Sequence, residues 1–260
     1  MKSSWFTRIL RILRLAFWLV GAAFTIGRLK NSNQAERNAA LSRLSYAALA
    51  ALDVRLTPQG LENVPAGRSL LLVANHISWL DIFALNALVP TGFIAKKELR
   101  SWPLVGRLMA NVGTVFIDRS SRKDTETIVR AINQALENGA SVCFFPEART
   151  SEGLALLPFK AALFQSALDT QTPIQAAALR YYDGQGRRTA EPSYAGDISL
   201  FASLWKIVSM KTLDIRVDFL APQTPEGDRF AVKETAEAGI AALVYEDSPV
   251  LPMPSENETK

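Results

Sequence analysis

At residues 70–88 the chain reads Leu-Leu-Leu-Val-Ala-Asn-His-Ile-Ser-Trp-Leu-Asp-Ile-Phe-Ala-Leu-Asn-Ala-Leu, and this stretch holds the only histidine in the sequence, His76. Its first five residues form a short apolar run, which is typical of a buried strand. Apolar residues recur at helical spacing over 77–88, so a helix is expected there. The stretch therefore predicts a strand, a turn that carries His76, and a helix.

Asp81 follows His76 by five residues. Five residues turn a regular helix through about 500°, so only a chain reversal would bring the two side chains together. Ser78 and Asp81 have the spacing of a capping box, which places the helix start at Ser78 and His76 just outside it. The carboxylate is then able to accept a hydrogen bond from one ring nitrogen and leave the other as a base. The alternative is that Asp81 only caps the helix and His76 is an ordinary turn residue.

Strands and helices alternate through the rest of the chain. Apolar or alternating runs predict strands at 54–57, 92–96, 114–117, 141–145, 172–180 and 213–220. Helical patterns occupy 35–52, 125–137, 198–210 and 230–245, and another helix is expected to open at Pro158-Phe159-Lys160. We therefore expect an α/β fold with a mixed, largely parallel sheet flanked by helices, and catalytic groups at strand ends.

Length and charge narrow the class of protein. With 260 residues, 48 % of them hydrophobic, the chain is long enough for one large domain. The first 30 residues carry six basic side chains and no acidic one, whereas the other 230 carry 23 basic and 25 acidic side chains. Because the net positive charge is confined to one end, it argues against a nucleic-acid partner and for contact of the N-terminus with an anionic membrane surface.

Residues 1–30 are expected to form an amphipathic or membrane-inserting helix. The 13 uncharged residues between Arg14 and Arg28 would span roughly 20 Å, less than the ~30 Å hydrocarbon core of a bilayer. A helix that lies in or dips into the cytoplasmic leaflet is favoured, with a single span or a signal peptide as alternatives. Residues 31–248 are assigned to one domain and 249–260 to a disordered tail.

Two kinds of catalytic group are not expected. Cys143, the single cysteine, lies in the apolar run 141–145 and is predicted to be a core residue, and no disulfide framework within the chain is possible. No Gly-x-Ser-x-Gly motif is present, and one histidine cannot build the usual zinc ligand sets. We therefore expect neither a covalent nucleophile nor a catalytic metal.

Four segments carry motifs at matching positions along the chain. They are Asn75-His76 with Asp81; Lys97, Leu99, Pro103, Gly106, Gly113 and Ile117-Asp118-Arg119; Phe145-Pro146-Glu147-Ala148-Arg149-Thr150-Ser151; and the strand 172–180. Together they resemble the motifs of the glycerolipid acyltransferase family, typified by 1-acylglycerol-3-phosphate acyltransferases, over residues 55–185. The third motif departs from the family pattern, since Ala148 replaces a glycine and Arg149 comes one position early. The fourth has Ala176 where the family has a second proline.

The resemblance implies a role for each matching residue. His76 would be the general base and Asp81 would orient it. Arg119 would bind the phosphate of the acceptor, which a guanidinium grips bidentately; the alternative is a solvated Arg119 paired with Asp118. The other substrate-binding residues carried over from the motifs are Asn75, Lys97, Glu147, Arg149, Thr150 and Ser151. Backbone amides at the start of the helix at Ser78 are candidates for stabilising the oxyanion.

The implied activity belongs to phospholipid biosynthesis at the cytoplasmic face of the inner membrane. A fatty acyl group would pass from a thioester, on coenzyme A or acyl carrier protein, to the free hydroxyl of 1-acylglycerol-3-phosphate and give phosphatidic acid, with no cofactor. Within the same chemistry, the acceptor could be a lyso-ornithine lipid or another lysophospholipid. Alternative functions of other classes are a membrane lipid-binding protein without catalysis and a hydrolase that releases free fatty acid.

Overall fold

A seven-stranded sheet forms the centre of the fold in the computed structural model, which describes residues 2–29, 32–96, 101, 114–117 and 124–250. The strand order is β1-β7-β6-β2-β5-β3-β4. The strands are β1 (Val54–Gln59), β2 (Leu71–Ala74), β3 (Gly92–Lys96), β4 (Val115–Ile117), β5 (Val142–Phe144), β6 (Ile174–Asp183) and β7 (Leu213–Phe219).

The sheet is mixed and largely parallel, as the alternation of strands and helices predicts. Strands β2 to β6 run in one direction, β7 pairs antiparallel with β6, and β1 pairs parallel with β7. Because β2 and β5 are parallel neighbours, with Val73 opposite Phe144, their carboxyl ends meet at one edge of the sheet. The turns that follow these two strands therefore lie together.

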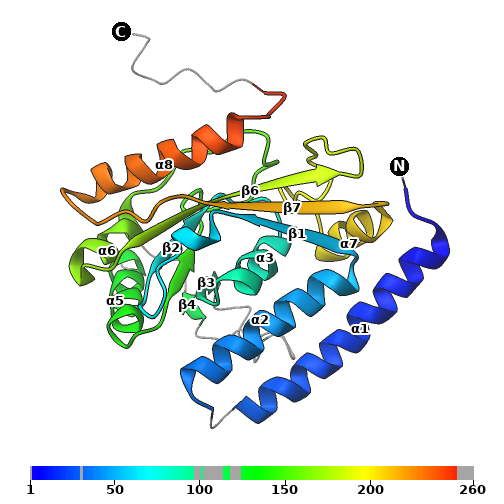
Figure 1. Cartoon of the computed structure of the whole chain (residues 1–260), viewed down its shortest axis with the longest axis horizontal. Coiled ribbons are helices and arrows are strands. Elements are labelled where there is room, and N and C mark those ends of the chain that lie inside the picture. Colours follow the sequence, from blue (N-terminus) through cyan, green and yellow to red (C-terminus); the bar gives the residue numbers. More distant parts are fainter. Residues whose placement is uncertain (1, 30–31, 97–100, 102–113, 118–123, 251–260) are drawn as a thin grey trace.

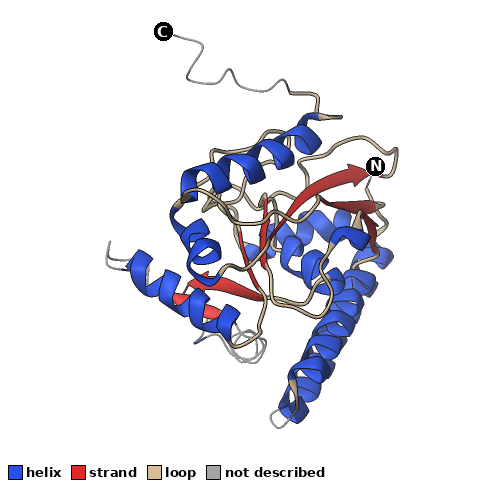
Figure 2. Cartoon of the chain, turned by 60° about the vertical axis from the view of Figure 1, so that its left-hand side comes forward, coloured by secondary structure: helices blue, strands red, loops and turns tan. Residues whose placement is uncertain are grey.

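Helices cover both faces of the sheet (Figures 1 and 2). One core packs the sheet against α2 (Gln34–Ala51), α3 (Leu80–Leu88) and α7 (Leu200–Ser209). The other packs it against α5 (Asp124–Glu137), α6 (Gln165–Thr170) and α8 (Arg229–Tyr245). Outside these layers, α1 (Trp5–Arg28) runs beside α2 (Figure 1) and is long and apolar enough, by length and composition, to cross a membrane.

Several expected boundaries are wrong, among them those of the first strand and of the helix at Pro158. The first strand continues past 57 to Gln59, and it tolerates Pro58 because β1 is an edge strand that needs no donor on its open side. No helix opens at Pro158: a 3₁₀ turn starts at Ala162 and α6 follows. The amides of Phe159 and Lys160 donate to the Glu237 carboxylate and the Pro146 carbonyl, which holds this irregular segment against α8 and the turn after β5. Residues 251–260, expected to be a tail, lie outside the described part.

Candidate active site

The turn after β2 carries the expected pair, but its helix begins later than the sequence predicts. Helix α3 starts at Leu80, and the Ser78 side chain makes no capping hydrogen bond. The Asp81 carboxylate caps the turn from inside the helix, because Oδ2 accepts from the amides of Ile77 at 2.7 Å and Ser78 at 2.9 Å. The chain reversal that these bonds hold places the imidazole of His76 over the first turn of α3.

His76 and Asp81 are hydrogen-bonded at 2.8 Å between Nδ1 and Oδ2. An ionised carboxylate only accepts, so Nδ1 carries the proton and Nε2 holds a lone pair. Nε2 has no hydrogen-bond partner among the residues that the structure describes, and the imidazole is 20 % exposed. Asp81 is fully buried, and its other oxygen, Oδ1, accepts from the Tyr181 hydroxyl at 2.5 Å. The arrangement gives an oriented imidazole with a basic nitrogen open to a substrate.

Phe145, directly after β5, supports the ring of His76, a role that the sequence did not indicate. The two rings stack with centroids 3.8 Å apart and an interplanar angle of 5°. Phe145 in turn contacts Phe93 of β3 at 5.7 Å. The feature of the sequence that could have indicated this role is an aromatic residue at the end of a predicted strand, where catalytic groups are expected. Stacking on one face and the bond to Asp81 together fix the plane of the imidazole.

Glu147 faces the backbone of the site and is 4 % exposed. Its Oε1 accepts from the His76 amide at 2.5 Å and its Oε2 from the Leu157 amide at 3.0 Å. Burial raises the pKa of Glu147 from its usual 4.5 to about 7, a shift that the two amides oppose and the Asp81 charge reinforces. Both carboxylate oxygens therefore accept hydrogen bonds from protein amides. The geometry gives Glu147 the role of holding the catalytic turn, whereas the motif implied a substrate contact.

Thr150 and Ser151 also bond to backbone groups. The Thr150 hydroxyl donates to the carbonyl of Tyr194 at 2.8 Å. The Ser151 amide donates to the carbonyl of His76 at 2.7 Å, and its hydroxyl donates to the same carbonyl at 3.2 Å. The two Ser151 bonds fasten the turn after β5 to the turn after β2. The structure thus gives both residues, implied to bind substrate, a supporting position.

Asn75 is likewise occupied by the protein. Its side chain is buried, its Nδ2 donates to the Leu179 carbonyl at 3.0 Å, and its Oδ1 accepts from the Leu179 amide at 2.7 Å. The amide extends the pairing of β2 with β6 by one further step. Asn75 therefore sets the register of β6 beside the site, although the motif implied substrate binding.

Arg149 is exposed, and it forms no hydrogen bond or ion pair with another residue in the described ranges. Of the third-motif residues implied to bind substrate, it alone has a charged group free of such bonds, so it stays a candidate for an anionic ligand. Ala148, which stands in place of the family's glycine, has a φ of +60°, the left-handed conformation that glycine adopts without strain. Lys97 and Arg119 lie outside the described residues, and their roles stay predictions.

Three backbone amides near the expected oxyanion donors are already bonded to carboxylates. The amides of His76, Ile77 and Ser78 donate to the carboxylates of Glu147 and Asp81. An amide that already donates to a buried carboxylate has no second proton for a substrate oxygen. These three amides hold the turn.

Comparisons with known proteins agree with this geometry. The model of the acyltransferase family matches residues 55–180. The 1-acyl-sn-glycerol-3-phosphate acyltransferase of Neisseria meningitidis is 49 % identical over 251 residues, covering 96 % of this chain and 98 % of that protein. The lyso-ornithine lipid O-acyltransferase of Pseudomonas aeruginosa is 33 % identical over 177 residues, covering 68 % of each.

The fold also has a solved counterpart. The crystal structure of the 1-acyl-sn-glycerophosphate acyltransferase from Thermotoga maritima superposes with a TM-score of 0.74 over 95 % of this chain and 96 % of that chain, at 20 % identity. The helical layers and the mixed sheet are thus an arrangement already known. With close relatives along nearly its whole length and the histidine and aspartate of the first motif in contact, this chain belongs to the acyltransferase family.

Proposed function

We propose that this protein transfers a fatty acyl group from a thioester to the free hydroxyl of 1-acylglycerol-3-phosphate, giving phosphatidic acid. The observation that carries the proposal is the hydrogen bond from His76 Nδ1 to the buried Asp81, which leaves Nε2 as a base without a protein partner in the described chain. The relative from Neisseria meningitidis, which is named for this activity, supports it by its 49 % identity over almost the whole chain.

In this reaction His76 Nε2 takes the proton of the acceptor hydroxyl as its oxygen attacks the thioester carbonyl carbon. The new C–O bond forms, the C–S bond breaks, and the thiolate leaves and receives a proton. Cys143 is fully buried in β5, and burial raises the pKa of its thiol, so it offers no thiolate for an acyl-enzyme. One direct transfer step accounts for the chemistry, with coenzyme A or acyl carrier protein as the carrier of the acyl group.

The choice of acceptor is a separate question. The lyso-ornithine lipid acyltransferases that resemble this chain cover about two thirds of it at 33–36 % identity, less than the 49 % over 96 % found for the Neisseria protein. This difference favours a phosphate monoester as the acceptor. Arg119 and the exposed Arg149 are the guanidiniums proposed to bind it.

The experiment for the acceptor offers purified protein acyl-coenzyme A with a panel of lyso-lipids and identifies the products by mass. Formation of phosphatidic acid from 1-acylglycerol-3-phosphate supports the proposal, and acylation of lyso-ornithine lipid alone would overturn the choice of acceptor. Free fatty acid as the sole product would identify a hydrolase, and binding without thiol release to either carrier would identify a lipid-binding protein. With Arg119→Ala, the KM for the phosphate acceptor should rise; an unchanged KM would count against phosphate binding by this residue.

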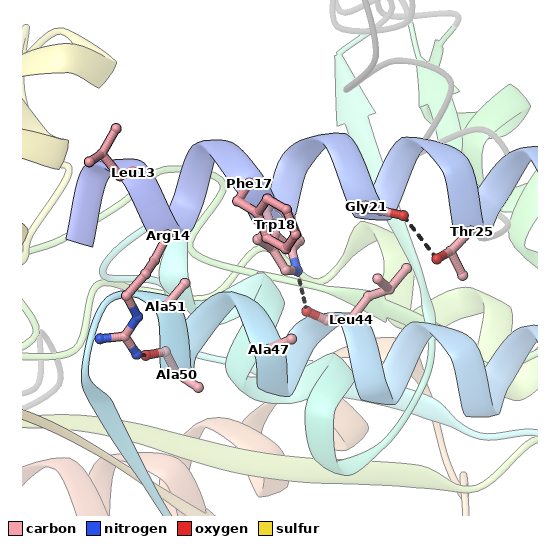
Figure 3. Close-up of a pocket in the computed structure, with 11 residues that line it drawn as sticks. Leu13, Arg14, Phe17, Trp18, Gly21, Thr25, Leu44, Ala47, Ala50 and Ala51 are labelled. Atoms are coloured by element: carbon pink, nitrogen blue, oxygen red, sulfur yellow. Dashed lines mark hydrogen bonds between the residues drawn. The ribbon is translucent and has the colours of Figure 1, made fainter. Parts of the chain in front are cut away.

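Membrane attachment is proposed through α1. One face of this helix presents large apolar side chains at i, i+3 and i+4 spacing, all more than half exposed: Phe6, Ile9, Leu13, Phe17, Val20 and Phe24. Between α1 and α2 lies a groove of about 660 Å³ with a mainly apolar lining (Figure 3). An apolar stripe of this kind is suited to the acyl region of a lipid leaflet.

The contacts of α1 with the domain favour a helix that lies in one leaflet over one that spans the bilayer. Arg11 is 3 % exposed and donates to Asp53 and to the carbonyls of Val208, Met210 and Lys211. Trp18 donates to the Leu44 carbonyl at 2.8 Å (Figure 3). Because these bonds fasten the helix lengthwise to the domain, a span would require breaking them. Protease accessibility of a tag at residue 1 in oriented vesicles tests the proposal: a tag on the same side as the domain supports it, and a tag on the opposite side overturns it.

A further inference from the structure

The carboxylate of Asp81 has a second partner that no motif points to. Its Oδ2 accepts from His76 Nδ1 and from the amides of Ile77 and Ser78, whereas its Oδ1 accepts from the hydroxyl of Tyr181 at 2.5 Å. Tyr181 is 1 % exposed. Both oxygens of the carboxylate are thus bonded, and one hydroxyl from β6 holds the oxygen that faces away from the catalytic turn.

The strand places this hydroxyl by its alternation. Ala177, Leu179 and Tyr181 face the core under α2, α3 and α7, while Arg180 and Tyr182 point the other way, toward Asp218, Glu246 and Asp247. The two bonds between Asn75 and the backbone of Leu179 fix the register two residues before Tyr181. A slip of one residue would put Tyr182 in the site and Tyr181 against α8.

We propose that Tyr181 is a positioning residue for acyl transfer: its hydroxyl fixes the orientation and the charge distribution of the Asp81 carboxylate, and through it the basic nitrogen of His76. The inference rests on the proposed function. It differs from packing alone because the hydroxyl draws negative charge toward Oδ1, away from the oxygen that faces the imidazole. The hydroxyl therefore tunes how strongly the pair favours the protonated imidazole.

The phenol is suited to this task. Burial, together with the charge of Asp81, raises the pKa of Tyr181 well above its usual 10, so the group stays a protonated donor. The other titratable groups that the described structure places around Asp81 are His76 on its own turn, Cys143 on β5 and Glu147 after β5. Cys143 has a raised pKa and stays neutral, whereas Glu147 titrates near pH 7 and must be considered in the pH readout.

The test compares Tyr181→Phe with Tyr182→Phe. Both variants remove one buried hydroxyl from adjacent positions of β6, but the Tyr182 hydroxyl donates to Asp247 on the far side of the sheet. Tyr181→Phe should lower kcat on the order of 10-fold with little change in KM, the range for loss of one hydrogen bond to a charged group. Its acidic limb of activity should move to higher pH, because charge returns to the oxygen next to the imidazole. Tyr182→Phe should change neither.

A readout without substrate separates this inference from the proposed function. Since the chain has a single histidine, ¹⁵N-histidine labelling gives one imidazole, whose tautomer and titration are followed by NMR. The expected result is an Nδ1–H tautomer whose titration midpoint rises by about half a unit or more in Tyr181→Phe and stays put in Tyr182→Phe. An unchanged midpoint overturns the inference, whatever the reaction proves to be. Absence of acyl transfer by the wild type, with the midpoint shifted, would overturn the function alone.

If Tyr181→Phe does not fold, 3-fluorotyrosine at position 181 replaces it. The more acidic phenol keeps its size and donates more strongly, so the titration midpoint of the imidazole should move to lower pH. A midpoint equal to that of the wild type would overturn the inference here as well. Glu147→Gln, combined with either change, shows whether the shift belongs to the imidazole and not to Glu147.

Discussion

The turns after β2 and β5 lie side by side at one edge of the sheet, and they use their polar groups differently. After β2, His76 and Asp81 bond to each other and leave one ring nitrogen open to a substrate. After β5, Glu147, Thr150 and Ser151 bond to backbone groups of the first turn, of Leu157 and of Tyr194. The first turn presents the reactive atom and the second holds it in place. Residues of the family motifs therefore have two kinds of role: some present a reactive group to the substrate, and others hold the backbone of the residues that do.

The largest effect is expected for the first turn itself. Asp81→Asn replaces an acceptor of three donors at Oδ2 by an amide, which reverses the orientation of the ring or leaves donors unpaired. The kcat should fall by about 10²–10⁴-fold, the range for loss of general-base catalysis. Initial rates of thiol release measure it, with the exposed Asp197→Asn as a matched control. If a folded Asp81→Asn protein kept more than a tenth of the wild-type kcat, the first turn would not have the catalytic role that distinguishes it from the second.

The second turn should show its role as a pH dependence of stability. The pKa of Glu147, about 7, is raised above its usual 4.5, so its contribution to stability is complete below about pH 4.5 and is lost as pH rises through about 7. Between pH 5 and 8 the wild type should lose about 2–3 kcal/mol relative to Glu147→Gln.

Urea unfolding of both proteins at the two pH values measures this loss. The exposed Glu152→Gln serves as the control, because it removes a surface carboxylate from the same turn. If the difference in the free energy of unfolding between wild type and Glu147→Gln were the same at both pH values, a raised pKa of a buried Glu147 would be contradicted.

Contact between the turns is tested at Gly153. Gly153 and Gly67 share a φ of +74°, but a Cβ at 153 would approach Ile77 Cδ1 to 2.5 Å, whereas a Cβ at 67 would meet nothing within 4 Å. Gly67→Ala should cost about 1–2 kcal/mol for the backbone conformation. Gly153→Ala should cost about 1–3 kcal/mol more, because it pushes the residue next to His76. Equal changes in the free energy of unfolding would argue that the two turns are not in close contact.

The smallest effect sharpens the account of the second turn. Ala148→Gly should stabilise the protein by up to about 1 kcal/mol, since it relieves a left-handed alanine and keeps its turn. Ala155→Gly, in the same loop but without a positive φ, should destabilise it. The Tm of each variant measures the effect. A Tm that shifts in the same direction for both variants would rule out strain at Ala148.

The sequence supports the fold and the central pair better than it supports the surroundings of the site. Strands and helices follow from local periodicity. The five-residue spacing of His76 and Asp81 allowed a contact without deciding it, and the resemblance to the family motif favoured the pair. Tyr181 lies 100 residues from Asp81, and its phenol cannot be told from a core aromatic until the register of β6 is known. The sequence shows that Glu147 follows a strand, but it does not show which backbone amides a buried carboxylate will meet.

Boundary errors have more than one origin. A capping box at Ser78 predicts that the hydroxyl caps the helix, whereas the Asp81 carboxylate accepts from the amides of Ile77 and Ser78. The apolar pattern after Pro158 favours a helix, but the chain is irregular up to Ala162 and its amides bond to α8 and to the turn after β5. At Ser78 a local carboxylate replaces the expected cap, whereas after Pro158 the irregular segment is bonded to distant parts of the chain.

The central claim is that the open nitrogen of His76 is the base of acyl transfer to a lysophospholipid. Its most direct test is the rate of phosphatidic acid formation from acyl-coenzyme A and 1-acylglycerol-3-phosphate by wild type and His76→Ala, with products identified by mass and folding checked by circular dichroism. The account predicts product from the wild type and a rate about 10²–10⁴-fold lower in the folded variant. A folded His76→Ala protein that turns over near the wild-type rate would contradict it.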